Sequence, residues 1–217
     1  MKHIYLFIFL LLFCSLGYSQ NPCPGIPTVK YAGQIYHTVL IGGDQCWLKE
    51  NLNVGTMIKW KKEQSNNRII EKYCFKDSLA NCTAYGGLYQ WAEAVQYKNG
   101  ANNTTSHPDF SGNIQGICPS GWHIPSEEDF NTLEKTEGSA SDEALLAVGQ
   151  GAGTNTSGFS ALLVNYFSIG HETTFWSFTE RTTCVALGLT LHLDGTDIQF
   201  SYNTKTQGNS VRCVKDY

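Results

Sequence analysis

The sequence predicts an α+β domain, with two or three helices packed on short antiparallel sheets. Apolar residues recur at helical spacing in two stretches near the middle of the chain, around residues 88–95 and 126–138. The last third is a series of short β-prone runs separated by turn residues. Strands that follow helices, instead of alternating with them, are typical of this fold class. Cysteines spread along the chain further predict a domain tied by disulfide bonds.

The first 19 residues have the pattern of a secretory signal peptide. Lys2 precedes an unbroken apolar run over residues 4–16, which is too short to cross a bilayer as a helix. Small residues at Gly17 and Ser19 stand before a predicted cleavage near Gln20. We therefore expect an exported protein, secreted or held at the cell surface, with the periplasm as the alternative location.

A lipoprotein signal is the alternative interpretation of this leader, with acylation at Cys14. Phe13 stands where such signals have a small residue, which favours simple removal of the leader. The mature chain, residues 20–217, is then predicted to be a single domain without a transmembrane segment, because no second apolar run of membrane length follows.

Composition restricts the partners of the mature domain. The formal net charge of the chain is -4, with no block of like charges, so its surface has no general attraction for nucleic acid. Aromatic residues make up 12% of the chain and charged residues 16%, a balance that favours a sizeable core over disorder.

The N-terminal part of the domain is predicted to form a β-hairpin within residues 31–53. Two β-prone runs, IYHTVLI and QCWLKENL, are separated by GGD at residues 42–44, which is turn chemistry. A further candidate strand is IIEKYCF, at residues 69–75.

The first helix is predicted to begin after Gly87. One apolar face, with spacing i, i+3, i+4 and i+7, is formed by Leu88, Trp91, Ala92 and Val95. Residues 98–116 are rich in Asn, Ser, Thr and Gly and are expected to form a linker or mobile loop. His107 in this loop is interpreted as a solvated residue, because no second metal ligand stands at helical or hairpin spacing.

A second helix is predicted to begin at Ser126 in the stretch CPSGWHIPSEEDF. Ser126 and Asp129 form a variant of the capping box, and the acidic residues of the first turn complement the helix dipole. The carboxylates are thus explained by helix initiation, since general acid/base catalysis would need a second titratable group with a perturbed pKa, which the sequence does not identify. Gly138 is expected to end the helix. A short third helix is predicted over residues 141–149, followed by a glycine-rich connector without the residues of a phosphate loop.

The last third is predicted to form an antiparallel sheet from GFSALLVNYF, TFWSFTE, CVALGLTLHL, TDIQFSY and SVRCVKD. Leucines alternate with other residues over residues 187–193, the period of a half-buried strand, and His192 would face away from them. The following DGTD contains an Asp-Gly pair typical of a tight hairpin. Asp194 and Asp197 are an alternative calcium contact, but an oxygen cage needs six or more ligands.

The cysteines indicate disulfides and not a metal site. Eight are present, and removal of the leader with Cys14 leaves an odd number, so at least one thiol stays unpaired. The spacings match no zinc pattern. Cys74 and Cys82 bracket a polar segment, and a bond between them would staple a turn. Spacing leaves the other pairings open.

Six segments stand in a fixed order along the chain: VLIGGDQCWLKENLN, YGGLYQW, GICPSGWHIPSEEDFNTLE, GFSALL, FWSFTE and SVRCVKD. This set resembles the Fibrobacter succinogenes major paralogous domain, a family of secreted bacterial domains, from about Tyr31 to Tyr217. The resemblance implies a branch of the C-type-lectin-like fold, in which FWSFTE would be a central strand. It also implies that Trp122 and Trp176 lie in the core.

The resemblance further implies the main disulfide. In the C-type-lectin-like fold a cysteine near the helices is bonded to one on the last strand, which corresponds here to Cys118 and Cys213. Cys23 and Cys46 then form the candidate third pair. This assignment leaves Cys184 as the unpaired thiol, a cysteine beyond the usual pattern of the family.

Two activities known from this fold do not carry over. Calcium-dependent lectins use Glu-Pro-Asn or Gln-Pro-Asp together with Trp-Asn-Asp, and none of these triplets occurs in the chain. Formylglycine-generating enzymes have an ending like VRC, but their redox chemistry needs two nearby cysteines, and Cys213 has no such neighbour. We expect no catalytic, metal-binding or cofactor-binding residues.

The sequence therefore predicts a calcium-independent, non-catalytic binding module for an extracellular protein or glycan, with no cofactor. The expected display surface is the loop at residues 168–173 together with the hairpin near Asp194. One alternative is a thiol-dependent enzyme that pairs Cys184 with His171 or His192, although only Arg181 provides positive charge nearby in the sequence. The other alternative is a structural component of the cell surface or matrix.

Overall fold

The structure, a computed structural model, describes residues 20–105, 108–138, 141–195 and 198–217. The expected signal peptide, His107 and Asp197 lie outside the described residues. The strands are β1 (Thr28–Tyr31), β2 (Gln34–Ile41), β3 (Gln45–Leu48), β4 (Thr56–Met57), β5 (Glu71–Lys72), β6 (Trp122–His123), β7 (Glu172–Thr182), β8 (Val185–His192), β9 (Gln199–Thr204) and β10 (Val214–Lys215).

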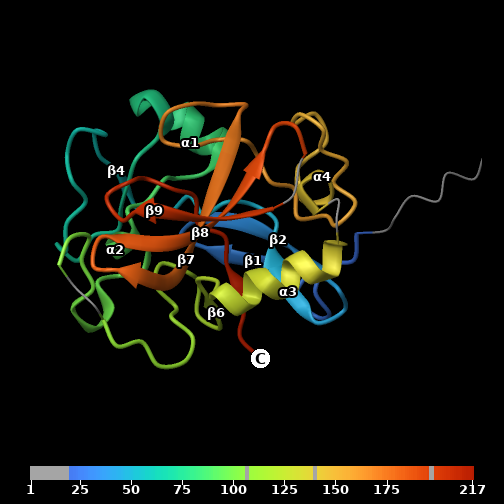
Figure 1. The fold of residues 1–217 in the computed structure, drawn as a ribbon, viewed down its shortest axis with the longest axis horizontal. Coiled ribbons are helices and arrows are strands. Elements are labelled where there is room, and N and C mark those ends of the chain that lie inside the picture. The colour runs from blue at the N-terminus through green and yellow to red at the C-terminus, as the bar shows by residue number, and fades with distance from the viewer. Residues whose placement is uncertain (1–19, 106–107, 139–140, 196–197) are drawn as a thin grey trace, which may run out of the picture.

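Short helices accompany these strands, so the mixed helix and sheet composition predicted from the sequence is confirmed. The α-helices of the described residues are α1 (Leu79–Tyr85), α2 (Trp91–Ala94), α3 (Glu127–Glu137) and α4 (Ser141–Leu145), one more than the largest number expected. Two single 3-10 turns are η1 (Phe75–Asp77) and η2 (Lys98–Gly100). In Figure 1, α1 and α3 lie on opposite sides of the strands.

The first sheet joins the two ends of the mature chain. Its order is β1-β2-β3-β10-β6, and its neighbouring strands are antiparallel. The predicted hairpin is confirmed: β2 and β3 pair from Thr38 opposite Leu48 to Ile41 opposite Gln45. Strand β1, which was not predicted from the sequence, extends the hairpin by one strand. Because β10 lies between β3 and β6, the C-terminal strand is held on both of its edges.

The second sheet has the order β7-β8-β9. The segment FWSFTE, within β7, was expected to form a central strand, but β8 occupies the middle of this sheet. The expectation that β8 is buried on one face only is also wrong, since residues 186–191 are all buried. The Thr190 hydroxyl makes hydrogen bonds with those of Thr174 and Ser201, at 2.9 and 2.7 Å, which satisfies the polar face of the strand inside the protein.

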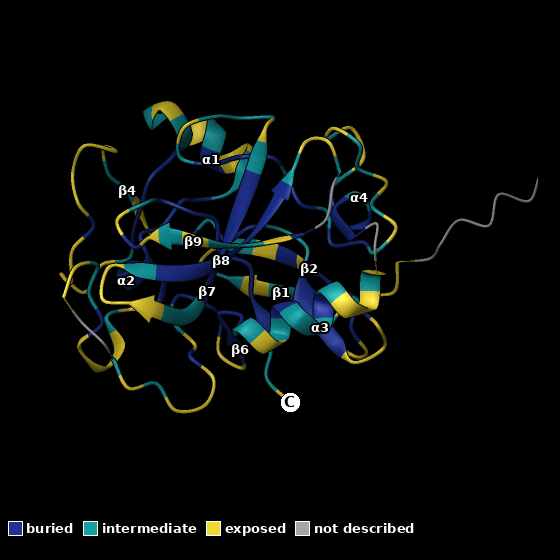
Figure 2. Cartoon of the chain, in the orientation of Figure 1, coloured by how far each residue is buried: buried dark blue, intermediate teal, exposed yellow. Residues whose placement is uncertain are grey.

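Two clusters of buried side chains form the core, and the strands lie between them. On β7, Phe175 belongs to one cluster and the adjacent Trp176 to the other. On β3, Trp47 and Leu48 divide in the same way. This follows from the alternation of side chains along a strand. Trp122 and Trp176 are both buried, as expected, and Figure 2 shows the buried strands within a more exposed set of loops.

Helix α3 is built as the sequence predicts. Ser126 is the N-cap; its hydroxyl accepts a hydrogen bond from the Asp129 backbone N–H, and the Asp129 carboxylate accepts one from the Ser126 backbone N–H. Phe130 and Leu133 are the buried residues of this helix, and Gly138 ends it with a positive φ of 73°. The short helix α4 stops at Leu145, before the expected end at Gly149.

The predicted helix after Gly87 is reduced to the single turn of α2. The residues before it cannot be helical because they form isolated β-bridges, Leu88 with Tyr73 and Tyr89 with Asn209. All four residues of α2 are buried, including Glu93, so the segment has no exposed helix face. Its apolar pattern therefore reflects burial on all sides and not an amphipathic helix.

Other strand predictions need similar corrections. Of residues 69–75, only β5 is a strand, and it pairs with β4 in parallel. The segment GFSALLVNYF contains isolated bridges, between Leu146 and Ala161 and between Val164 and Ile169, instead of a strand. Within the predicted linker at residues 98–116, the described residues form the turn η2 and irregular segments, and they pack against the core through Ala101, Ile114 and Phe110.

Three disulfide bonds are present among the described residues, and they join the pairs named from the sequence. Cys23 is bonded to Cys46, Cys74 to Cys82 and Cys118 to Cys213. Cys184 is a free, exposed thiol in the turn between β7 and β8. The bond from Cys118 to Cys213 spans a sequence separation of 95 residues and fixes the residues before β6 to those before β10.

Candidate functional site

An open cleft lined by aromatic side chains lies beside the Cys74–Cys82 disulfide bond. Its volume is about 340 Å³, and we call it the aromatic cleft. Its lining residues come from four separate segments of the chain: Trp60, Tyr73, Cys74, Phe75, Lys76, Leu88, Tyr166 and Phe167. Two of the rings are strongly solvent-exposed, with 48% of Trp60 and 74% of Phe167 accessible.

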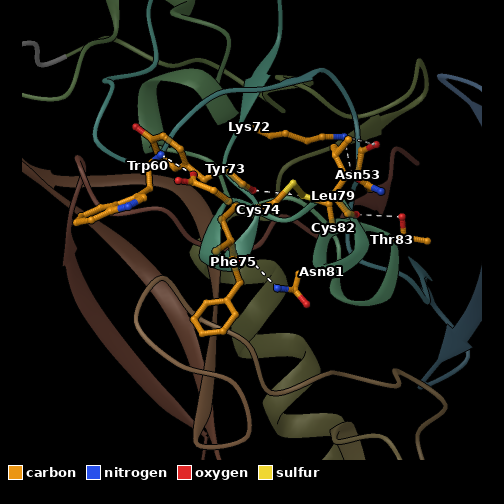
Figure 3. The surroundings of a disulfide bond; sticks show 12 residues. Asn53, Trp60, Lys72, Tyr73, Cys74, Phe75, Leu79, Asn81, Cys82 and Thr83 are labelled. Carbon is orange, nitrogen blue, oxygen red and sulfur yellow. Dashed lines mark hydrogen bonds between the residues drawn. A yellow bond between two sulfur atoms is a disulfide. The ribbon is translucent and has the colours of Figure 1, made fainter.

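The disulfide bond and the turn η1 position Phe75 at this cleft. Cys74 and Cys82 close a loop with a sequence separation of only eight residues. Within it the Asn81 side-chain amide donates to the Phe75 carbonyl at 2.7 Å, and the Asp77 backbone N–H donates to the Cys74 carbonyl at 2.8 Å. Figure 3 shows Trp60 and Phe75 extending away from the disulfide bond, on the side opposite Asn53. The loop is thus braced covalently and by hydrogen bonds.

The rings pack edge to face around Tyr166. Its ring centroid lies 6.0 Å from that of Trp60, 5.8 Å from that of Tyr73 and 5.1 Å from that of Phe167, with interplanar angles from 70° to 86°. Such contacts add roughly 0.5–1.5 kcal/mol each beyond the buried area. Gly208 lies beneath two of these rings, because a Cβ there would come within 3.0 Å of both Tyr166 and Tyr73.

The hydroxyls of the cleft tyrosines form hydrogen bonds within the protein. The Tyr73 hydroxyl donates to the Lys62 carbonyl at 2.8 Å, and the Tyr166 hydroxyl donates to the Trp60 carbonyl at 3.0 Å. Burial, together with the negative charge of Glu63, raises the pKa of both phenols above the ordinary value. Both therefore stay protonated at neutral pH and anchor the segment at residues 60–62 to the cleft.

Positive charge borders the aromatic cleft. The Lys76 ammonium lies 5.4 Å from the Phe75 ring centroid, and the Lys61 ammonium lies 5.5 Å from that of Trp60. Neither lysine forms an ion pair with another described residue. Asp77, in contrast, accepts a hydrogen bond from the Trp60 backbone N–H and lies 3.8 Å from the Lys59 ammonium.

A second cavity of about 520 Å³ is lined by β2, the residues that follow β3, α1 and the segment around Ser160, and its lining residues include Arg212. The Arg212 guanidinium is fully buried, donates to the Phe159 carbonyl and to Asn51 Oδ1, and stacks against the rings of Phe159 and Phe175. Burial lowers its pKa to about 9. Because solvent does not reach this guanidinium, its contacts indicate a structural role and not a ligand-binding one.

The thiol and histidines of the enzyme alternative are separated by the length of a hairpin. Cys184 precedes the first residue of β8, whereas His192 is its last. Strands rise by about 3.3 Å per residue, which puts these residues roughly 25 Å apart. His171 lies at the far end as well, because its carbonyl accepts a hydrogen bond from the Leu193 backbone N–H at 2.8 Å. These residues therefore do not form a catalytic pair.

The aromatic cleft was not predicted from the sequence, but the expected display surface lies next to one of its walls. The expected display loop at residues 168–173 begins directly after Phe167, yet Thr173 is fully buried. Trp60 and Phe167 stand in segments without regular secondary structure, and large aromatic residues in such segments were the available signal. Their proximity could not be inferred, because more than 100 residues separate the Tyr166 hydroxyl from the carbonyl it contacts.

Two features are absent from the described residues. No group of three or more His, Cys, Asp or Glu side chains in that part of the chain is arranged to hold a metal ion. None of its helices has the length and apolar character needed to span a membrane.

Comparison with known protein families places most of the chain. The family model of the Fibrobacter succinogenes major domain matches residues 39–215. No curated protein and no solved structure matches the chain significantly.

Proposed function

The chain belongs to the Fibrobacter succinogenes major domain family, and we propose that this member is an exported, non-catalytic binding module that holds a protein or glycan ligand in the aromatic cleft without calcium. The observation that carries this proposal is the exposure of Trp60 and Phe167 in a cleft braced by a disulfide bond. Exposed aromatic rings on a rigid frame lose little conformational entropy on binding and are typical anchors of recognition sites.

The leader and the cysteines support the export of the protein. A basic residue, an apolar run and small residues before Gln20 form the pattern of a cleaved signal. Three disulfide bonds fit an oxidising compartment, where such bonds persist. Export and cleavage are tested by expression of the full chain in a Gram-negative host, followed by fractionation and N-terminal sequencing. A mature protein that begins near Gln20 is expected, and retention of the uncleaved chain in the cytoplasm would contradict the proposal.

We also propose that the fold is a branch of the C-type-lectin-like fold. The support is the bond between Cys118, which precedes the helix α3, and Cys213, which directly precedes the last strand. Superposition of an experimental structure on solved C-type-lectin-like domains tests this assignment. A topology that cannot be superposed would contradict it, without affecting the proposed binding role of the aromatic cleft.

The binding role is tested with the mature domain, residues 20–217, on glycan and protein arrays with calcium and with a chelator. We expect a ligand of one class to be retained in the chelator. Phe167→Ala is expected to weaken its binding, whereas Tyr202→Ala is the matched control, because Tyr202 is 65% exposed but does not line the cleft. Binding that Phe167→Ala leaves unchanged would contradict the assignment to this cleft. Absence of any ligand would favour the structural alternative.

A further inference from the structure

We infer that the aromatic cleft binds a peptide segment in which one apolar side chain is flanked by carboxylates. This inference deepens the proposed function and rests on it. It commits to one class of ligand, an acidic peptide with an apolar anchor, where the proposed function leaves protein and glycan open. Three features of the cleft carry it: its size, the orientation of its rings and the charge at its border.

The size of the cleft fits a single anchoring side chain. Its volume of about 340 Å³ lies at the lower end of the range of small-ligand pockets, roughly 300–1,000 Å³. Leu88 and Tyr73 are buried in its lining, whereas Trp60 and Phe167 are exposed at it. An apolar side chain inserted here would cover these exposed rings and remove apolar surface of both partners from water, which favours binding.

The orientation of the rings favours a peptide anchor over a sugar. Neighbouring rings of Trp60, Tyr166 and Phe167 stand at 73° and 86° to each other, so they form no continuous flat surface on which a sugar ring could stack. The hydroxyls of Tyr73 and Tyr166 already donate to backbone carbonyls of the protein. The cleft therefore offers few of the placed polar groups that orient a polyhydroxylated ligand.

The charge at the border of the cleft favours carboxylates beside the anchor. Lys76 is the one formally charged residue of the lining, and Lys61 lies against the outer ring of Trp60. The nearby acids already have partners: Asp77 accepts a hydrogen bond from the Trp60 backbone N–H, and Glu71 accepts one from the Ser65 backbone N–H at 2.8 Å. Glu63, whose charge acts on both cleft tyrosines, accepts one from the Gln90 side-chain amide. An incoming carboxylate would thus meet lysines that have no competing ion pair among the described residues.

The test uses a displayed library of random 12-residue peptides, panned on the mature domain, residues 20–217. The expected product is a set of peptides with an apolar residue next to Asp or Glu. Binding of the synthetic peptides is then measured by fluorescence anisotropy. Phe167→Ala should weaken it about tenfold, as loss of an anchor contact does. The pair Lys61→Glu and Lys76→Gln should weaken it on the order of fivefold, with a smaller dependence on salt.

Lys30→Glu is the matched control, because Lys30 is an exposed lysine of β1 outside the cleft and should leave binding unchanged. Enriched peptides without acidic residues, or affinities that ignore the two lysine changes, would overturn the inference. A glycan ligand sensitive to Phe167→Ala, with no enriched peptide, would overturn the peptide class and leave the proposed function standing. If neither a peptide nor a glycan bound, the proposed function would be contradicted as well.

Discussion

At the scale of single residues, Arg212 is a fully buried charge that packs between core side chains. Its guanidinium bridges the Phe159 carbonyl and Asn51 Oδ1 and is covered by the rings of Phe159 and Phe175. A lysine cannot reproduce this planar, two-sided set of contacts. Arg212→Lys should therefore lower the free energy of unfolding by about 3 kcal/mol, because a buried acceptor loses its partner.

Urea denaturation of the mature domain measures this loss. Arg181→Lys is the matched control, since Arg181 lies at the surface in an ion pair with Glu127, and exposed pairs contribute only about 0–1 kcal/mol. Equal urea midpoints for the wild-type protein and Arg212→Lys would show that the contacts of Arg212 with Phe159 and Asn51 do not stabilise the fold.

His123 is predicted to make the stability of the domain depend on pH. Its imidazole is buried between Asp216, 2.6 Å from Nδ1, and Asp129, 3.2 Å from Nε2. Burial alone lowers its pKa, but the hydrogen bonds and charges of the two carboxylates outweigh burial, so the pKa is raised above its ordinary value. The pKa of Asp129 is lowered: burial raises it, but the bonds from His123 and Ser126 outweigh that effect.

The sign of the effect follows from these two shifts. A histidine with a raised pKa stabilises the fold fully below its unfolded pKa of about 6.5, and this contribution is lost as the pH rises through the folded pKa. Asp129, with a lowered pKa, contributes above about pH 4, and its contribution is lost as the pH falls through its folded pKa. Both contributions are present together between about pH 4 and 6.5.

The destabilisation caused by His123→Gln should therefore be larger at pH 5.5 than at pH 8.5. Urea midpoints of the wild-type protein and the variant at both pH values measure this difference. His37→Gln serves as the control, because the side chain of His37 is 61% exposed in its pair with Glu50. A difference that is equal at both pH values would contradict the protonated state of His123 in the folded protein.

At the scale of elements, the N-terminus of α3 depends on the capping box of Ser126 and Asp129. Removal of the Ser126 hydroxyl leaves the Asp129 backbone N–H without the acceptor that it has at 3.1 Å. Ser126→Ala should thus lower the free energy of unfolding by about 1 kcal/mol. Thr136→Ala, on an exposed position of the same helix, is the control and should change the stability little. If Ser126→Ala had the same free energy of unfolding as the wild-type protein, the capping box would not contribute to stability.

The elements that sequence reasoning identified correctly are those with a local signal. The capping box of α3 and the GGD turn between β2 and β3 are specified by adjacent residues. In contrast, α2 and β8 were misjudged because burial by distant segments changes the meaning of an apolar pattern. Trp91, for example, donates from its indole N–H to the Ser177 carbonyl at 3.0 Å, a contact that local periodicity does not reveal.

The candidate site was the least predictable part of the molecule for the same reason. Its walls come from segments around Trp60, Tyr73 and Tyr166, and the contacts that unite them have long sequence separations. Residues of a single wall have no distinguishing pattern, because isolated exposed aromatics are common at protein surfaces. Only the fold shows that these particular rings form one cleft.

At the scale of the whole molecule, two of the disulfide bonds are expected to have different roles: one mainly stabilises the fold, and the other mainly supports ligand binding. In the chain-entropy model, a bond stabilises more when it closes a longer loop. The bond between Cys118 and Cys213 spans 95 residues and should contribute roughly 4–5 kcal/mol. The bond between Cys74 and Cys82 spans 8 residues and should contribute roughly 2–3 kcal/mol.

The short bond is nevertheless the one beside the aromatic cleft, because Cys74 lines the cleft and precedes Phe75. Cys118→Ala with Cys213→Ala should reduce the urea midpoint more, and Cys74→Ala with Cys82→Ala should reduce ligand binding more at a temperature where both variants are folded. Circular dichroism establishes the folded state, and anisotropy measures binding. The two double variants could instead change stability and binding in the same proportion. That result would mean that binding depends on the stability of the whole domain, and that the Cys74–Cys82 bond has no separate local effect on the cleft.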